Sequence, residues 1–212
     1  MGLALLLVED HAFSRTTMTA ALSMRGVHVI ACATAADAMD AARASAPDVA
    51  VLDLDLGGGP TGLDLAVALR QEFPDVGLVI LTGFRDPRLA ARDLPALPRG
   101  AAYVCKSDVD DFGALERLLM SVHREPLRIR SLAGTASGPT ATLTDHQVEV
   151  LLAVAEGYTS AQIATERGTS VGAVEQTIAR VCERLGIPRE EGLNRRAQLV
   201  QVVSQSRAGA RT

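Results

Sequence analysis

Short apolar runs alternate with segments of helical periodicity in the first half of the chain. The apolar runs lie at Leu3–Val8, Val27–Ala31, Val49–Leu54, Val76–Leu81 and Ala101–Cys105. The segments between them place apolar residues at helical spacing, at Phe13–Met24, Ala35–Ala46, Leu63–Phe73, Phe112–His123 and, weakened by Pro95 and Pro98, at Pro87–Leu94. This alternation predicts an α/β fold with a doubly wound, five-stranded parallel sheet that helices cover on both faces.

The second half has a different pattern. Residues 125–141 contain scattered Pro, Gly, Ser and Thr, which is typical of a linker. Four helices are predicted after it: one that begins after Thr144 and ends near Gly157, then Ser160–Arg167, Ser170–Leu185 and Arg195–Ser204. The predicted organisation is therefore an α/β domain over 1–124, a linker over 125–141, a small all-α domain over 142–206 and a tail over 207–212.

Composition and charge narrow the classes of function. The apolar fraction of 48% and charged fraction of 22% match an ordinary globular protein. Residues 1–125 hold 17 acidic against 11 basic side chains, a net charge of −6, and residues 126–212 hold 8 against 10, a net charge of +2. The acidic half suits a metal or a cationic partner, and the mildly basic half permits contact with nucleic acid. Three isolated cysteines, and a first apolar run too short for a signal peptide or membrane span, predict a cytoplasmic protein without a membrane partner.

Polar residues follow four of the predicted strands. Glu9 and Asp10 come after the first strand, Asp53 ends the third, Thr82 follows the fourth and Lys106 follows the fifth. In doubly wound sheets the carboxyl ends of the strands form the reactive edge. There a carboxylate can accept a phosphoryl group, further carboxylates can hold Mg²⁺, and a hydroxyl and an ammonium can neutralise charge on the transferred group. Lys106 is the only Lys among 21 basic residues, which indicates a position that needs a compact point charge.

This order of residues resembles the flavodoxin-like receiver domain of two-component response regulators over residues 1–124. The resemblance implies that a histidine kinase phosphorylates Asp53, and that Mg²⁺ is bound by Glu9, Asp10, Asp53 and the backbone carbonyl of Asp55. It further implies that the phosphoryl group is contacted by Thr82 and Lys106, and that Thr82 and Tyr103 act as switch residues. The chain departs from the family pattern at Gly57–Pro60 and Gly62, where the loop beside the metal site is one residue longer.

The rear domain resembles the helix-turn-helix output domain of the LuxR/NarL (FixJ) type, through Leu143-Thr144, Glu149-Val150-Leu151, Ala155-Glu156-Gly157, Ile163-Ala164, Ser170 with Val174, Arg184-Leu185-Gly186-Ile187 and Arg196-Ala197-Gln198-Leu199. In this architecture the third helix enters the major groove of DNA. Its core stripe is predicted at Val174, Ile178, Val181 and Leu185. The predicted DNA-binding residues are Ser170, Glu175, Gln176, Thr177, Arg180 and Arg184. In the last helix, Leu199, Val202 and Val203 fit either core or a dimer seam, with core preferred.

Three readings follow, and the preferred one is a non-enzymatic response regulator. In it, a histidine kinase phosphorylates Asp53, and the modified protein binds double-stranded DNA as a homodimer and controls transcription. A phosphate-independent or protein-binding regulator is the alternative, which the altered loop Gly57–Pro60 and Glu175 favour. The family usually has Lys where this chain has Gly172 and Glu175, and His where it has Thr177. The other alternative is a haloacid-dehalogenase-type phosphatase, with Asp53 as nucleophile and Asp55 as general acid. In that family, however, the acidic metal-binding pair follows the lysine rather than preceding the nucleophile.

Overall fold

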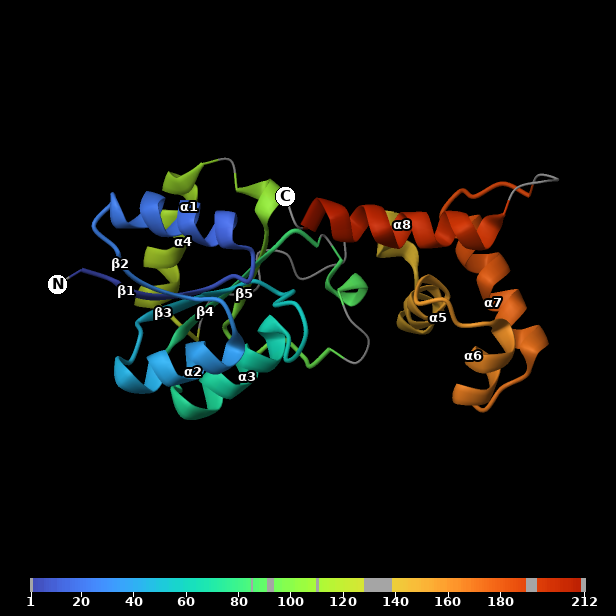
Figure 1. Cartoon of the computed structure of the whole chain (residues 1–212), viewed down its shortest axis with the longest axis horizontal. Coiled ribbons are helices and arrows are strands. Elements are labelled where there is room, and N and C mark those ends of the chain that lie inside the picture. Colours follow the sequence, from blue (N-terminus) through green and yellow to red (C-terminus); the bar gives the residue numbers. More distant parts are fainter. Residues whose placement is uncertain are drawn as a thin grey trace. The chain divides into compact units, whose positions relative to one another are not determined.

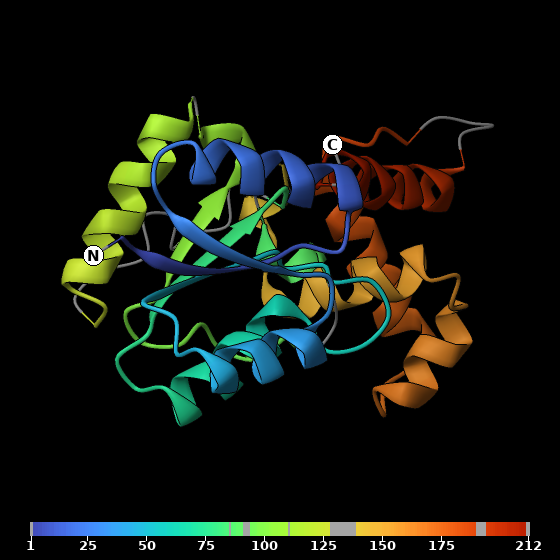
Figure 2. The ribbon, with the colours of Figure 1, turned by 60° about the vertical axis from the view of Figure 1, so that its left-hand side comes forward.

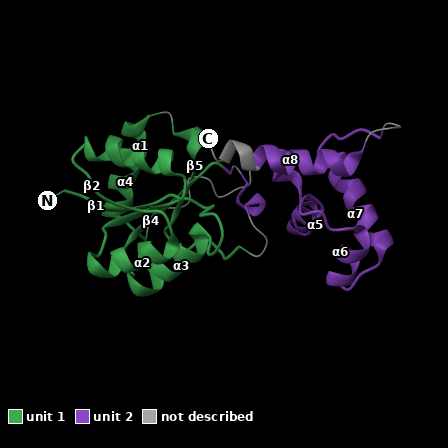
Figure 3. Cartoon of the chain, viewed as in Figure 1, with its two compact units in different colours: residues 1–83, 94–134 green, residues 84–93, 135–212 purple. Residues whose placement is uncertain are grey.

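The computed structural model of the chain describes residues 2–84, 86–90, 94–109, 111–127, 139–189 and 194–210. The chain divides into two compact units, and each is described by itself (Figure 3). Unit 1 comprises residues 1–83 and 94–134, and unit 2 comprises residues 84–93 and 135–212. The predicted linker falls largely on residues 128–138, which lie outside the described residues.

Unit 1 contains one five-stranded parallel sheet with the strand order β2-β1-β3-β4-β5 (Figure 1). The strands are β1 (Ala4–Val8), β2 (His28–Cys32), β3 (Val49–Leu52), β4 (Gly77–Thr82) and β5 (Ala102–Cys105). Two of the three inner strands, β3 and β4, are buried along their whole length, as expected for strands covered on both faces. The predicted doubly wound parallel sheet is confirmed.

Helices cover both faces of this sheet. Helices α1 (Ala12–Ser23) and α4 (Phe112–Arg124) lie on one face, and α2 (Ala35–Ala44) and α3 (Gly62–Glu72) lie on the other (Figures 1 and 2). On the face of α1 and α4, Leu5 and Leu7 of the sheet pack in one core cluster with Leu22 and Leu119. Alternate residues of each strand thus supply two separate layers of core. Because the strands are parallel, the carboxyl ends of β1, β3 and β5 lie at one edge of the sheet.

Unit 2 is helical, as predicted. It contains a short 3₁₀ helix η3 (Pro139–Thr142) and the helices α5 (Asp145–Ala155), α6 (Ser160–Glu166), α7 (Val171–Arg184) and α8 (Arg195–Ala210). Thr144, Thr159 and Ser170 cap the first three of these helices with their side-chain oxygens. In α8, Leu199 and Val203 are buried and Val202 is half-buried, which agrees with the preferred assignment of this face to the core. Among the described residues, no helix is long and apolar enough to cross a membrane.

The segment between β4 and β5 differs from the prediction. Of the helix predicted over Pro87–Leu94, the structure has only the 3₁₀ turn η1 (Pro87–Leu89); Leu94 is not helical, and residues 91–93 lie outside the described residues. Pro95 and Pro98 lack the backbone N–H groups that a longer helix would need. Residues 84–93 moreover belong to unit 2, although the sequence assigned them to the front domain.

Candidate functional site

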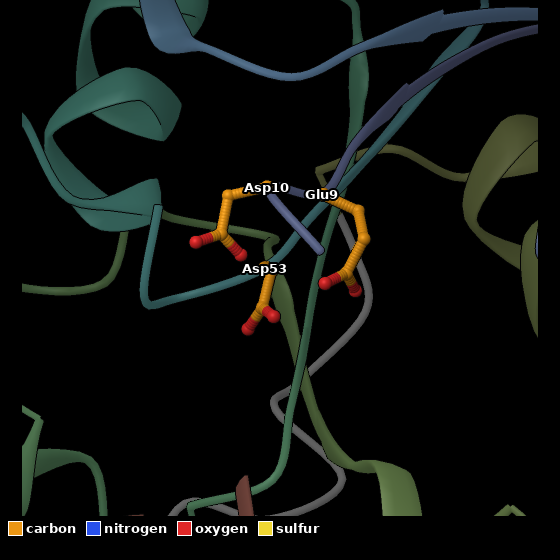
Figure 4. A group of neighbouring side chains, drawn as sticks. All are labelled: Glu9, Asp10 and Asp53. Carbon is orange, nitrogen blue, oxygen red and sulfur yellow. The ribbon is translucent and has the colours of Figure 1, made fainter. Parts of the chain in front are cut away.

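Three acidic side chains meet where strands β1 and β3 end. β1 and β3 are neighbours in the sheet, and the Asp53 N–H extends their ladder by donating to the carbonyl oxygen of Val8 at 2.8 Å. One carboxylate oxygen from each of Glu9, Asp10 and Asp53 lies within 4.8 Å of the other two, and the three side chains are neighbours (Figure 4). A cluster of carboxylate oxygens in this range fits a hard divalent cation such as Mg²⁺.

Lys106 faces two of these carboxylates from the end of β5. Its Nζ lies 2.8 Å from Glu9 Oε2 and 2.9 Å from Asp53 Oδ2. The Glu9 and Asp53 side chains are only 3% and 7% exposed, and that of Lys106 is 24% exposed. The structure therefore brings together Glu9, Asp10, Asp53 and Lys106, which the sequence placed at three different strand ends. Their chemical roles stay predictions.

Burial and charge oppose each other at Asp53. The net effect of the environment is to raise the pKa of Asp53 from 3.8 to about 6. Burial is the main cause of this increase, the Lys106 ammonium opposes it, and the neighbouring Glu9 carboxylate adds to it. Burial also lowers the pKa of Lys106, but attraction to Asp53 and Glu9 outweighs it, so that the net shift of this pKa is upward. The single half-buried ammonium of Lys106 thus does not fully compensate the negative charge of the carboxylates around it. The site retains an affinity for further positive charge.

The other predicted residues of this site lie on the adjoining strand ends. Thr82 is the last residue of β4; it is fully buried and pairs in register with Cys105 of β5, one residue before Lys106. Tyr103 is also buried, at 4% exposure, and lies on β5 in register with Ile80. Asp55 is half-buried, and its Oδ1 accepts a hydrogen bond from Gly57 N at 3.3 Å.

The glycine-rich loop borders the acidic cluster, as its sequence position predicts. Gly57 and Gly59 have φ values of 80° and 135°, which few residues other than glycine adopt. A Cβ on Gly57 would lie 3.4 Å from Asp10 Oδ2, so the backbone of the loop passes beside this carboxylate. A Cβ on Gly62 would lie 2.0 Å from the carbonyl oxygen of Asp53, so α3 begins in direct contact with the Asp53 backbone only because this residue is glycine.

Arg15 is part of this site, and sequence reasoning missed it. Its Nη1 donates to the backbone carbonyl oxygens of Glu9 at 2.7 Å and Asp10 at 3.0 Å. A basic residue in the first turns of α1 is opposed by the helix dipole, and α1 has no acidic residue in its first turn. This unfavourable placement was the available sign that Arg15 has a partner outside the helix.

In unit 2, helix α7 presents the predicted polar face. Val174, Ile178 and Val181 are buried and Leu185 is half-buried, while Glu175, Gln176, Arg180 and Arg184 are exposed on the opposite side. The Ser170 hydroxyl oxygen caps the helix by accepting from Ala173 N at 3.2 Å. Thr177 is half-buried, and its hydroxyl donates to the carbonyl oxygen of Ala173 at 3.0 Å.

Two residues of this face have partners inside their own unit. Glu175 accepts a hydrogen bond from the Ser160 hydroxyl of α6 and lies 3.8 Å from Arg196 Nη1 of α8. Arg184 Nη1 donates to the Thr142 carbonyl oxygen at 2.6 Å and to Gln147 Oε1 at 2.9 Å. These contacts connect α7 to the other helices of the unit, and they could not be predicted from the sequence because the partners are distant along the chain. The predicted contacts of Glu175 and Arg184 with DNA stay predictions.

Comparison with known proteins identifies the family. A family model for the response regulator receiver domain matches residues 5–104, and one for region 4 of sigma-70 factors matches residues 141–185. The transcriptional regulatory protein DesR of Bacillus subtilis is 32% identical over 159 residues, which cover 73% of this chain and 74% of DesR. The DNA-binding transcriptional activator DevR/DosR of Mycobacterium tuberculosis is 32% identical over 165 residues, with the same coverage of both chains. The chain is a response regulator of the LuxR/NarL type.

The solved structures agree with this assignment in fold. A structure of RcsB from Salmonella enterica serovar Typhimurium, bound to a promoter in the presence of BeF₃⁻, has a TM-score of 0.59 and 15% identity, with coverage of 97% of this chain and 99% of RcsB. As a response regulator, the chain combines a receiver domain with a helix-turn-helix domain. This combination of domains is consistent with transcription regulation controlled by phosphorylation. Membership of this family favours the regulator over the phosphatase alternative.

Proposed function

We propose that Asp53 of this response regulator accepts a phosphoryl group from a histidine kinase and that this modification controls DNA binding and transcription. The observation that carries the proposal is the convergence of the Glu9, Asp10 and Asp53 carboxylates with the Lys106 ammonium, 2.9 Å from Asp53, at one edge of the sheet. A nucleophile, a cation site and a fixed positive charge in one place are the parts that phosphoryl transfer to a carboxylate needs.

In the proposed reaction, a carboxylate oxygen of Asp53 attacks phosphorus of the kinase phosphohistidine. The new bond joins this oxygen to phosphorus, the P–N bond breaks, and the imidazole nitrogen keeps the bonding electrons and later takes a proton from solvent. Lys106 moves from the Asp53 carboxylate to the phosphoryl oxygens and neutralises part of their charge. The Thr82 hydroxyl donates a hydrogen bond to the same group, and Tyr103 follows the displacement of Thr82.

Mg²⁺ is the proposed metal, held by Glu9, Asp10, Asp53 and the backbone carbonyl of Asp55. The donor set consists of oxygen atoms only, and the three carboxylates exceed the single ammonium in charge. When bound, Mg²⁺ would neutralise charge on the phosphoryl oxygens and the acceptor carboxylate. Arg15, which holds the backbone carbonyl groups of residues 9 and 10, keeps the turn that carries two of the ligands in place.

The proposed output is DNA binding by α7, with a homodimer as the active form. Gln176 and Arg180 are exposed on the face opposite the core stripe, and Ser170 caps the helix end that would meet a phosphate. Gln can read adenine and Arg can read guanine in the major groove. The proposal places this reaction in the cytoplasm, and the three cysteines, which are free thiols, fit a reducing compartment.

The first experiment is labelling by a small phosphoryl donor. We expect acetyl phosphate with Mg²⁺ to add one phosphoryl group per wild-type chain, visible by intact-mass spectrometry and removed by hydroxylamine. Asp53→Asn should take up none. Asp55→Asn, which keeps its backbone carbonyl, is the matched control and should still be labelled. Equal labelling of wild type and Asp53→Asn would refute Asp53 as the acceptor.

A second experiment separates the phosphate-independent alternative, which the partnered Glu175 in place of a usual Lys favours. Double-stranded DNA selected from a random pool by the wild type is titrated with and without beryllofluoride. An increase in affinity that depends on beryllofluoride and is absent in Asp53→Asn supports control by phosphorylation. Equal affinity under all conditions would favour the alternative.

A further inference from the structure

The chain leaves unit 1 directly after the residue proposed to contact the phosphoryl group. Thr82 ends β4 in unit 1, and Phe84, two residues later, already belongs to unit 2 (Figure 3). Phe84 and Leu89 are buried, and the chain returns to unit 1 at Leu94 before it forms β5. A crossover between neighbouring parallel strands is usually a helix packed on the sheet. Here the crossover segment is instead built into the unit that contains the helix-turn-helix.

An ionic cluster, named the clamp here, fixes this segment within unit 2; it comprises Asp86, Arg88, Thr140 and Asp145. Asp86 Oδ1 and Oδ2 each accept from the Arg88 guanidinium at 2.9 Å, in a bidentate pair. The Thr140 hydroxyl donates to Asp86 Oδ2 at 2.7 Å. Arg88 Nη1 reaches on to Asp145 Oδ1 at 2.9 Å, at the first residue of α5.

Arg88 also donates to backbone carbonyl groups that lead into α5. Its Nη1 lies 3.0 Å from the Leu143 oxygen and its Nη2 lies 3.2 Å from the Thr140 oxygen. One guanidinium therefore holds both the crossover segment and the chain that enters the first helix of the DNA-binding unit. Asp145 is 85% exposed, so that the geometry depends on Asp86, Thr140 and these carbonyl groups rather than on Asp145.

The burial of this cluster indicates that it fixes one arrangement of the segment rather than adding net stability to the fold. The Asp86 side chain is 1% exposed, and both of its oxygens are hydrogen-bonded. Buried ion pairs contribute little net stability, because loss of hydration offsets their attraction, but they disfavour every arrangement in which one charge loses its partner. Residues 86–88 can therefore move relative to the start of α5 only if a buried charge loses its partner.

We propose that the clamp transmits the phosphorylation state of the receiver to the DNA-binding helices. This inference rests on the proposed function. Displacement of Thr82 toward a phosphoryl group moves Phe84 and the rest of the segment, and the clamp passes this movement to the start of α5. A protein without the clamp then still takes up the phosphoryl group, but its DNA affinity no longer depends on it.

The test compares the ratio of DNA affinities with and without beryllofluoride. The variant Asp86→Asn/Arg88→Met removes both charges, so that neither remains buried alone. Arg167→Met, which breaks the Arg167–Glu149 ion pair within the same unit, is the matched control. For wild type and control we expect a ratio of about tenfold, a typical size for coupling between two sites, and for the clamp variant a ratio within about twofold of one. Stoichiometric labelling by acetyl phosphate should be the same in all three proteins.

The outcomes distinguish the inference from the proposed function. If the wild type gives no response to beryllofluoride, the proposed function fails and the inference fails with it. If the wild type and the clamp variant respond equally, only the inference fails. Hydrogen exchange of the wild type keeps the test independent of how the variant folds: beryllofluoride should change exchange in peptides covering 84–90 and 139–150. Unchanged exchange in both peptides would overturn the clamp proposal.

Discussion

Replacing the proposed acceptor Asp53 by Asn should stabilise the metal-free receiver. A pKa of about 6 in place of 3.8 means that the folded environment disfavours the ionised carboxylate by about 3 kcal/mol at neutral pH. Burial is the main cause, and attraction to Lys106 only partly offsets it. Asn has nearly the same shape and carries no charge. We expect Asp53→Asn to increase the free energy of unfolding by about 1 to 3 kcal/mol at pH 7.5.

The increase in the free energy of unfolding caused by Asp53→Asn should become smaller as the pH falls. Because the pKa of Asp53 is raised in the folded state, the folded protein binds a proton more readily than the unfolded chain. The destabilisation by Asp53 is therefore fully present above pH 6 and disappears as the pH falls toward 4. The difference between variant and wild type should shrink over this interval. Mg²⁺ should stabilise the wild type more than Asp53→Asn, since the variant lacks one of the ligands.

The assay is urea-induced unfolding in the presence of EDTA. Hydrogen exchange of peptides from β1 and β3 is the readout, so that only unfolding of the receiver is observed. Asp40→Asn, which changes a carboxylate that is 82% exposed, is the matched control and should change stability little at any of these pH values. A lower stability of Asp53→Asn than of wild type at pH 7.5 without Mg²⁺ would show that the Lys106 ion pair outweighs the penalty of burial, and would refute this reasoning.

Three further predictions use the same assays. Lys106→Met leaves two buried carboxylates without their cation and should lower the stability of the metal-free receiver by about 3 kcal/mol, part of which Mg²⁺ restores; unchanged stability in EDTA would contradict this. Gly62→Ala places a Cβ 2.0 Å from the Asp53 carbonyl oxygen and should abolish labelling by acetyl phosphate, whereas Gly58→Ala, with open space around it, should be labelled like the wild type. Thr159→Ala removes the cap of α6 and should lower the stability of unit 2 by about 1 kcal/mol, measured by exchange of its peptides; equal exchange would exclude a role for the cap.

The hydrophobic pattern was sufficient to predict the architecture. Each apolar run became a strand within one or two residues of its predicted bounds. For the inner strands the reason is that a strand buried on both faces must be apolar at every position. In unit 2, Thr144 and Ser170 marked the starts of α5 and α7 in the sequence, and both cap these helices in the structure. The cap of α6 by Thr159 was not predicted. The segment after β4 was predicted wrongly as a helix, since its apolar residues allow helical spacing but its packing partner lies more than fifty positions later in the chain.

The sequence predicted those residues of the candidate site that the strand topology alone brings together. Parallel strands place their carboxyl ends at one edge, so that Glu9, Asp53 and Lys106 could be brought together before any distance was known. Arg15 and Arg88 could not be found in this way, because a flexible arginine reaches partners that depend on side-chain packing. In a chain with twenty Arg residues, the composition does not separate these two from solvent-exposed ones.

Two buried aspartates, one in each unit, show how the same residue can serve opposite purposes. The carboxylate of Asp86 accepts four hydrogen bonds from Arg88 and Thr140. Any displacement of this side chain would break hydrogen bonds in a buried place and is therefore unfavourable. Asp53 is also buried, but its environment raises its pKa, and its cationic partner Lys106 is shared with Glu9. A buried carboxylate whose charge is not fully compensated is stabilised by a bound metal ion or by modification. A carboxylate whose hydrogen bonds are all made is stabilised by neither. The different charge balance of the two sites therefore supports different roles for the two aspartates. Asp53 is the residue that is modified, and Asp86 holds the segment that follows Thr82 in a fixed position.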